Sequence, residues 1–256
     1  MIKHNLSLLR NGMTGFYKKL VRNVPSIGIA EINVGLFSIM VVNDRGGCGL
    51  ATPLKDYQCF IKDGKLLKLK NPKKHLNTGS LAQWILSENT IEASVGIAAL
   101  NSTIKVDGAS IAKGNAYEVI LKKGFNRNVA VIGHFPGIDK YKDKFKNLWI
   151  IEKRPLQGDI PESAKDTVLS KADVVAITGT SIINHTLFSI LESCRRDAYK
   201  IILGPSVPMT PLLFECGIDM LSGSIVHNID EVRKCVLSGA SFKQFKGITH
   251  INYFVR

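Results

Sequence analysis

Cysteine is scarce in this sequence, and its cysteines are far apart. The five cysteines stand at positions 48, 59, 194, 216 and 235, and no two of them form a Cys-x-x-Cys pair. That spacing excludes a disulfide framework and a structural zinc site of the usual kind. We therefore expect free thiols that are buried as small apolar side chains.

Long hydrophobic runs are also missing. The longest apolar stretch, from Ile32 to Val42, is interrupted by Asn33 and Ser38 and is shorter than the roughly 18–20 residues that span a bilayer. The first ten residues show no apolar segment typical of a secretory signal. Hydrophobic residues nevertheless make up 45% of the chain, which is enough for a large buried core. We expect a soluble cytoplasmic protein that contacts no membrane.

Acidic residues are few, since 21 Asp and Glu stand against 34 Lys and Arg, and the net charge is +13. Such a balance is typical of proteins that bind nucleic acid or anionic small molecules, but also of an ordinary soluble surface. The basic residues are spread out and are not interleaved with aromatic residues, as a surface for single-stranded nucleic acid requires. We therefore expect no nucleic-acid partner, and an anionic small molecule or a metal chelate as the ligand.

The first half of the chain predicts a small α+β domain. Apolar residues recur every three or four positions from Ile2 to Leu20, as in an amphipathic helix. Residues 26–52 read as three strands joined by turns, and Asp63-Gly64 predicts a further hairpin. Two helices are predicted next, at residues 80–88 and 90–102, and the second is rich in small residues that permit close packing.

The second half predicts a domain of a different kind. Between Ile104 and Asn128 the chain is rich in Gly, Lys and Asn, and we place the domain junction there, with domains of residues 1–120 and 121–256. Beyond it a strand and a helix alternate five times, which implies a parallel sheet with helices on both faces. The expected fold class is α/β, a small α+β domain followed by a Rossmann-like, doubly wound parallel sheet. The predicted strands are Val129–Ile132, Leu148–Glu152, Val174–Thr178, Lys200–Leu203 and Met220–Leu221.

The turn after the first of these strands lacks the glycines of a dinucleotide site. Ligands of such sheets bind beyond the carboxyl ends of the strands. Gly133 occupies the tight turn, but His134, Phe135 and Pro136 stand where further glycines are needed for close approach of a pyrophosphate. NAD is therefore not expected as a cofactor. His134 and Phe135 instead offer an imidazole and an aromatic face to a planar or metal-bound ligand, although a lone histidine is more often structural.

Two carboxylates follow the second predicted strand. Glu152 lies nineteen positions after the glycine turn, where nucleotide-binding Rossmann domains hold the ribose hydroxyls, but an ion pair with the two basic residues after it explains it as well. Asp159 either caps the next helix or turns inward. If both carboxylates turn inward near His134 or His185, they form an oxygen and nitrogen ligand set for a divalent metal.

Hydroxyl-rich turns follow the third and fourth predicted strands. The third turn precedes a predicted helix, whose first N–H groups and the hydroxyls together suit a carboxylate or phosphate. Helix capping explains the same pattern, and Asn184 either holds the loop or reaches the ligand. Ser206 lacks an adjacent base, which disfavours a nucleophilic serine. The candidate ligand-binding residues of the two turns are Thr178, Gly179, Thr180, Asn184, Gly204, Pro205 and Ser206.

Five segments, taken in order, resemble a known family over nearly all of the chain beyond about Ser26. They are "ENTIEASVGIAALNS", "VIGHFPGI", "IIEKRPLQGDIPESA", "DVVAITGTSIINHT" and "ILGPSVPMTPLLFECGIDMLSG". The set is similar to the heavy-metal-chelation family, which is catalogued as a domain of unknown function. The resemblance implies an enolase-amino-terminal-like domain followed by a Rossmann-like domain, with the site in the cleft between them. It points to the turn residues named above, Pro136 included, and adds Glu92 and Asn101 from the first domain.

Three hypotheses of function follow. The first is a protein that binds a metal chelate or an anionic small molecule in the interdomain cleft, in heavy-metal or tetrapyrrole-like cofactor metabolism, with His134, Glu152 and Asp159 as metal ligands. The second is a nucleotide- or S-adenosylmethionine-dependent transferase, which Glu152 motivates. The third is a non-catalytic interaction module with a vestigial pocket. A homodimer is expected, because two-fold dimers are the commonest oligomers.

Overall fold

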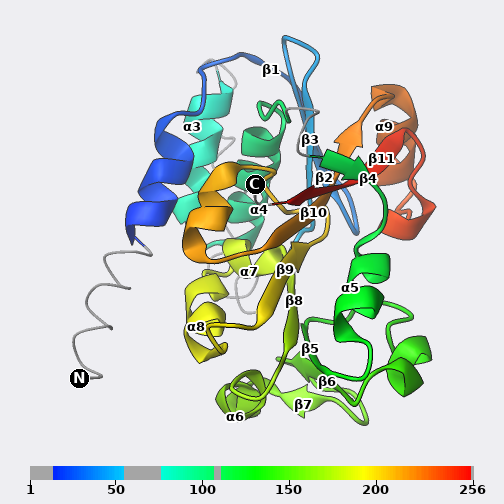
Figure 1. The fold of residues 1–256 in the computed structure, drawn as a ribbon. Helices are drawn as coiled ribbons and strands as arrows, with labels where there is room; N and C mark the ends of the chain where they lie inside the picture. Colours follow the sequence, from blue (N-terminus) through cyan, green and yellow to red (C-terminus); the bar gives the residue numbers. More distant parts are fainter. Residues whose placement is uncertain (1–13, 55–75, 107–110, 255–256) are drawn as a thin grey trace.

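The chain forms two β-sheets with helices packed against them, in a computed structural model (Figure 1). The structure describes residues 14–54, 76–106 and 111–254. Residues 14–22 are helical and agree with the predicted amphipathic helix. The start of that helix and the hairpin predicted at Asp63-Gly64 lie outside the described residues.

The smaller sheet is antiparallel, and its three strands agree with the pattern read from residues 26–52. A helical layer of three short elements follows it in the chain. The strands, in sheet order, are β1 (Ile29–Val34), β2 (Ile39–Asn43) and β3 (Cys48–Ala51), and the helical elements are α3 (Thr78–Ala82), the 3-10 helix η1 (Gln83–Leu86) and α4 (Thr90–Asn101).

Close packing of α4 explains its small residues. Every residue of α4 from Glu92 to Leu100 is buried, so the helix lies inside the molecule and carries no polar stripe. A side chain at Gly49 on β3 would place its Cβ 2.0 Å from the carbonyl oxygen of Ala98. Glycine therefore lets β3 lie directly on the helix backbone.

The larger sheet has eight strands. Six neighbouring strands pair in parallel, and two more join one edge through antiparallel pairs, so that only one strand runs against the others. From β5 the chain steps outward first to β6 and β7 and then, in the other direction, to β8, β9 and β10, which is the 3-2-1-4-5-6 order of Rossmann folds. This confirms the predicted α/β class. In sheet order the strands are β4 (Ile111–Lys113), β11 (Ile248–Phe254), β10 (Met220–Val226), β9 (Tyr199–Leu203), β8 (Val174–Thr178), β5 (Asn128–Ile132), β6 (Asn147–Glu152) and β7 (Ile160–Pro161).

Both faces of this sheet are buried, because neighbouring residues of each central strand point to opposite sides. Val129 and Val131 of β5 pack in a cluster with Ile120, whereas Ala130 packs in a second cluster with Phe188. Ile120 belongs to α5 (Ala116–Gly124) and Phe188 to α8 (Leu187–Ser193), which lie on opposite sides of the sheet (Figure 1).

The helical connections differ from the predicted ones in two ways. After the first and fourth predicted strands the chain forms 3-10 helices, and α5, β4 and β11 appear where no element was predicted. The remaining elements of the large sheet's connections are η3 (Asp139–Lys144), η4 (Glu162–Ala164), α6 (Lys165–Leu169), α7 (Thr180–Ile183), η5 (Pro211–Cys216), α9 (Ile229–Leu237) and η6 (Phe242–Gln244).

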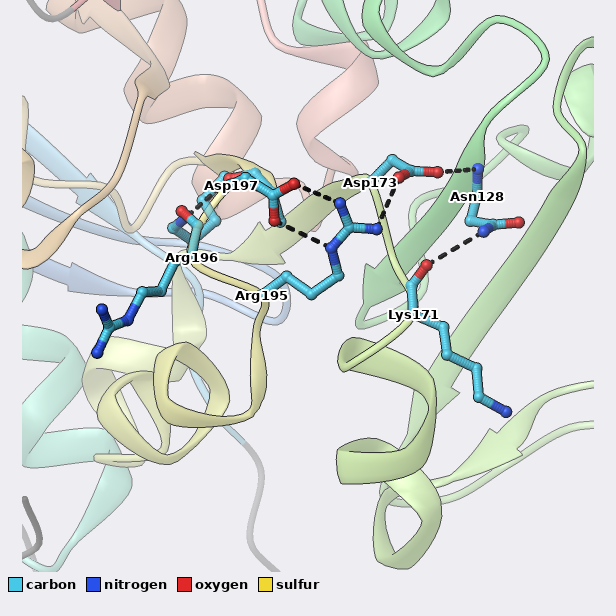
Figure 2. Close-up of polar contacts among 8 residues, drawn as sticks. Asn128, Lys171, Asp173, Arg195, Arg196 and Asp197 are labelled. Carbon is cyan, nitrogen blue, oxygen red and sulfur yellow. Dashed lines mark hydrogen bonds and ion pairs between the residues drawn. The ribbon is translucent and has the colours of Figure 1, made fainter. Parts of the chain in front are cut away.

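Polar contacts tie the amino ends of β5, β8 and β9 together (Figure 2). The Asp173 carboxylate accepts a hydrogen bond of 2.9 Å from the backbone N–H of Asn128 and pairs at 3.0 Å with the guanidinium of Arg195. Arg195 also contacts the exposed Asp197, and these contacts lower the pKa of the Asp197 carboxyl. The network lies at the end of the sheet opposite to the predicted site, so we assign it to folding.

None of the helices formed by the described residues combines the length and the apolar character needed to cross a membrane. The domain boundary that we place at residue 120 stays a prediction. Strand β4 precedes that boundary in the chain, and it pairs with β11 in the larger sheet.

Candidate functional site

The turns that follow β5, β8 and β9 meet around one cavity of about 480 Å³, which we call the central cavity. The parallel order explains this convergence, because neighbouring parallel strands end at the same edge of the sheet. Nine of the residues predicted from the sequence line this cavity. They are His134, Phe135, Pro136, Thr178, Gly179, Thr180, Gly204, Pro205 and Ser206.

Glycines permit the close approach of these turns. At Gly179 a Cβ would lie 2.8 Å from the Val207 side chain and 3.0 Å from its backbone nitrogen, so the turn after β8 can lie against the turn after β9 only without a side chain. Gly133 and Gly204 have φ angles of +94° and +117°, which other residues adopt rarely. Gly179 and Gly204 therefore shape the wall of this cavity, and Gly133 sets the path of the turn that leads to His134.

The first part of the chain also reaches the central cavity. Thr52, which directly follows β3, lines it and donates its backbone N–H to the Oγ of Ser206 at 2.8 Å. Ser206 is 1% exposed, so its hydroxyl is held in a buried contact between the two sheets. This contact gives Ser206 a structural role, and a site between the two parts of the molecule stays a prediction.

Sequence reasoning missed one side of the central cavity. Tyr117 comes from α5, while Phe242, Lys243 and His250 come from the segment from η6 to β11. Lys243 Nζ and the Tyr117 hydroxyl both donate to the carbonyl oxygen of Pro136, at 2.5 and 3.2 Å. The helix cap at Asn115, which accepts from the Tyr117 N–H, was the available signal for α5.

The described lining of the central cavity carries a lysine and no acidic residue. It includes Lys243 and two imidazoles, His134 and His250, and contains no carboxylate among the described residues. Burial lowers the pKa of His250 from its usual 6.5, and burial raises the pKa of Tyr117. The lining also includes the aromatic rings of Phe135 and Phe242. A cavity of this composition suits an anion that carries a planar or apolar group.

A second cavity of about 410 Å³, the side cavity, lies beside the first and shares His134, Thr178 and Thr180 with it. Glu152 lines it at the tip of β6, next to the point between β5 and β8 where the strand order reverses. Asn184 lines it too, and its Oδ1 accepts from the Thr186 hydroxyl at 2.7 Å. Asn184 therefore holds its own loop at the edge of this cavity, and its role as a ligand-binding residue stays a prediction.

Two of the three predicted metal ligands lie together. His134 Nδ1 is 3.5 Å from the Asp159 Oδ2, and the Asp159 side chain is 5% exposed while that of His134 is 42% exposed. Asp159 also accepts the backbone N–H of Leu156 at 2.9 Å. Within the described residues, no three His, Cys, Asp or Glu side chains gather closely enough to hold a metal ion. The arrangement supplies an imidazole and a carboxylate, and Glu152 stands apart from them.

The predicted anion site at the turn after β8 differs from the structure in its backbone. The helix that follows, α7, has four residues, which is too short to concentrate N–H groups and a helix dipole at its start. The Gly179 N–H donates to the Leu203 carbonyl at 2.8 Å, and the hydroxyls of Thr178 and Thr180 lie 2.9 Å apart. Thr178 and Thr180 line the central cavity, and their role as ligand-binding residues stays a prediction.

The remaining candidates lie away from the central cavity. The Glu92 carboxylate is buried and accepts the Ser87 hydroxyl at 2.7 Å. Asn101 lines a third cavity, of about 340 Å³. The Nε2 of His185 lies 2.8 Å from the Ile85 carbonyl oxygen, and its ring packs edge-on against Tyr17, so this histidine joins three helical elements.

Comparison with known proteins agrees with this architecture. Residues 115–255 match a family model, DUF364, and residues 17–104 match a second, DUF4213, and both carry the description "Putative heavy-metal chelation". An uncharacterized protein of Methanocaldococcus jannaschii is 25% identical over 213 residues, which are 80% of this chain and 80% of that protein.

Two crystal structures share the fold. One, from Desulfitobacterium hafniense, has a TM-score of 0.81 at 24% identity and covers 96% of this chain and 100% of its own. The other, from Pyrococcus horikoshii, has a TM-score of 0.76 at 20% identity and covers 95% of this chain and 99% of its own. Both are described as proteins of unknown function from the DUF364 family. The likeness concerns the fold.

Proposed function

The chain belongs to the DUF364/DUF4213 family, and on that premise we propose that its central cavity binds an anionic small molecule or a metal chelate. One observation carries the proposal: the strand-end turns enclose a cavity whose described lining has Lys243, His134 and His250 but no carboxylate. The basic side chains attract an anion more strongly here than in water, because the partly apolar walls screen their charge less than water does. Such a ligand would place the protein in heavy-metal or tetrapyrrole-like cofactor metabolism.

A chelate fits the site better than a bare metal ion. Of the predicted metal ligands only the His134 imidazole lines the central cavity, with the Asp159 carboxylate 3.5 Å from it, whereas divalent zinc or nickel takes four or more ligands. A metal that arrives with a small chelator brings the missing ligands with it. The chelator's negative charge then faces Lys243 and the aromatic walls.

Calorimetry with three probes tests the proposal: Zn²⁺ alone, citrate alone, and zinc citrate. We expect zinc citrate to bind more tightly than either component. Lys243→Met should weaken the binding of citrate and zinc citrate alike, because it removes the cation. His134→Ala should weaken the binding of zinc citrate and leave citrate nearly unchanged, because it removes the metal ligand.

His227→Ala is the matched control, since it removes an exposed histidine that lines neither the central nor the side cavity. Its affinities should equal those of the unmodified protein. If no probe binds, or if all three variants bind equally well, the proposal is wrong and a non-catalytic interaction module becomes the better explanation.

A specific observation favours a second candidate, a nucleotide- or S-adenosylmethionine-dependent transferase. Glu152 lines the side cavity at the tip of β6, the position from which Rossmann domains hold ribose hydroxyls. Adenosine, ATP and S-adenosylmethionine should then each raise the melting temperature, and Glu152→Gln should reduce that rise. Unchanged melting with all three ligands would exclude this candidate.

A further inference from the structure

Four exposed apolar side chains gather at one place on the surface, which we call the apolar patch. Three come from the end of β1 and the turn to β2, and one is the last residue of α9. Large apolar side chains that are exposed together, and not singly, mark a surface that binds another molecule. The four are Val34, Leu36, Phe37 and Leu237, which are 46%, 54%, 47% and 67% exposed.

The two segments that carry the patch are held against each other. A Cβ at Gly35 would lie 2.5 Å from the Val236 carbonyl oxygen, so the turn after β1 lies directly on the end of α9. A Cβ at Gly239 would lie 3.8 Å from the Leu36 side chain, which brings Leu36 to the residues that follow α9. The Gly35 N–H donates to the Ser38 carbonyl at 2.9 Å and closes the turn. The patch is therefore formed before a partner arrives, and little conformational entropy is lost when it is covered.

The two segments of the patch contain no charged residue. Residues 34–42 and 235–241 have no Asp, Glu, Lys or Arg, although the whole chain carries a net charge of +13. Arg233, one turn before Leu237 in α9, is paired with Glu31 at 2.7 Å. An acidic protein or an anionic membrane surface is attracted by cations, and the patch itself supplies none.

A second copy of this chain fits such a surface. Two copies that each carry +13 repel one another, and an uncharged face is where that repulsion is smallest. A two-fold axis places the same patch on both sides of the interface, so apolar side chains meet apolar side chains. We propose that the apolar patch is the contact surface of a two-fold homodimer, with Leu36 and Leu237 at its centre. The proposal does not depend on the function of the central cavity, whose lining includes none of the four side chains.

The size and the surroundings of the patch set the expected behaviour of the dimer. A contact built on two short segments is smaller than the standard interface of about 800 Å² per partner, so we expect a dissociation constant of about 1–100 μM. Lys234 is exposed three residues before Leu237, and a two-fold axis brings its copy near. Screening of this repulsion should tighten the dimer when the salt concentration rises from about 0.05 to about 0.5 M. A contact between opposite charges would weaken instead.

Sedimentation velocity of the full chain, at concentrations around the expected dissociation constant, tests the proposal. Leu237→Glu should weaken association at least about tenfold, because it places an unpaired carboxylate in the contact. Leu36→Glu should do the same from the other segment. Leu156→Glu is the matched control, since Leu156 is as exposed, at 66%, but follows β6. An equimolar mixture of Leu237→Glu and Leu237→Lys should associate again, because the two patches then carry opposite charges.

Several results would overturn the proposal. They are a chain that stays monomeric up to about 1 mM, association that persists in Leu237→Glu and Leu36→Glu, an equal effect of Leu156→Glu, and a dimer that salt weakens. Binding of the monomer to neutral phosphatidylcholine vesicles, lost in Leu237→Glu, would assign the patch to a lipid surface instead. None of these outcomes bears on the zinc citrate experiment.

Discussion

The imidazole of His250 links the pH of the solution to the stability of the fold. It lines the central cavity as an exposed residue of β11, edge-on to Phe242 with 5.5 Å between the ring centres, and partial burial of the ring lowers its pKa from 6.5. The unfolded chain then binds a proton more readily than the folded one below pH 6.5. Stability from this group is complete above about pH 6.5 and declines as the pH falls toward the lowered value.

We therefore expect the melting temperature to fall between about pH 6.5 and 5, and we expect His250→Gln to flatten that part of the profile. Thermal melts of both proteins across this range measure the difference. His227→Ala serves as the control, because His227 does not line the central cavity. Parallel profiles for the unmodified protein and His250→Gln would show that burial of His250 does not contribute.

Residues at the carboxyl ends of parallel strands were predictable, and residues from other elements were not. His134, Thr180 and Ser206 reach one cavity because strand order alone brings their turns together. Lys243 reaches the same cavity from η6 and His250 from the antiparallel strand β11, whose mixed sequence carries no clear alternation. Burial of Asp159 beside His134 depends on how the turn after β6 folds back, which spacing does not reveal.

At the scale of elements, the network at the amino ends of β5, β8 and β9 should stabilise the sheet through Asp173 (Figure 2). Asp173→Ala removes the acceptor for the Asn128 N–H and the partner of Arg195. We expect a loss of about 1–2 kcal/mol in the free energy of unfolding, measured by urea denaturation.

Asp197→Ala is the matched control for Asp173→Ala. It also removes a carboxylate that contacts Arg195, but Asp197 is exposed, and exposed ion pairs contribute little. Its denaturation curve should nearly coincide with that of the unmodified protein. Equal losses in the two variants would mean that the network acts through its charge and not through the hydrogen bond to the strand end.

Strands with a short run of apolar residues were predicted well. Elements that depend on a helix cap or on pairing with a distant strand were not. The strands β5, β6, β8 and β9 are short apolar runs between turns, and their buried positions explain why composition alone reveals them. Helix α5 begins at the cap Asn115 inside a segment rich in Gly and Lys, and composition concealed it. Segment 139–144 has helical spacing but forms a 3-10 helix without buried residues.

At the scale of the whole molecule, the two sheets share one core. A single cluster of buried side chains contains Tyr17 and Ile97 from the first part of the chain and Val175 and Phe188 from the second. Sequence patterns indicated two units because the composition changes between them, yet no pattern could show that their apolar faces meet. The expected homodimer likewise stays a prediction, which sedimentation would test.

A continuous core predicts that the chain unfolds in one transition. Tyr17 tests this coupling. Its buried hydroxyl donates to the Ile182 carbonyl of α7 at 2.8 Å, and this bond joins the helix of residues 14–22 to a helix of the larger sheet. Tyr17→Phe should lower the free energy of unfolding by about 1 kcal/mol and shift the single calorimetric peak down by about 2–4 °C. Tyr141→Phe, which removes a hydroxyl from a half-buried ring outside this core, should leave the peak in place. Two separate peaks, with one of them unmoved by Tyr17→Phe, would mean that the two parts unfold independently and that the shared apolar contacts do not couple them.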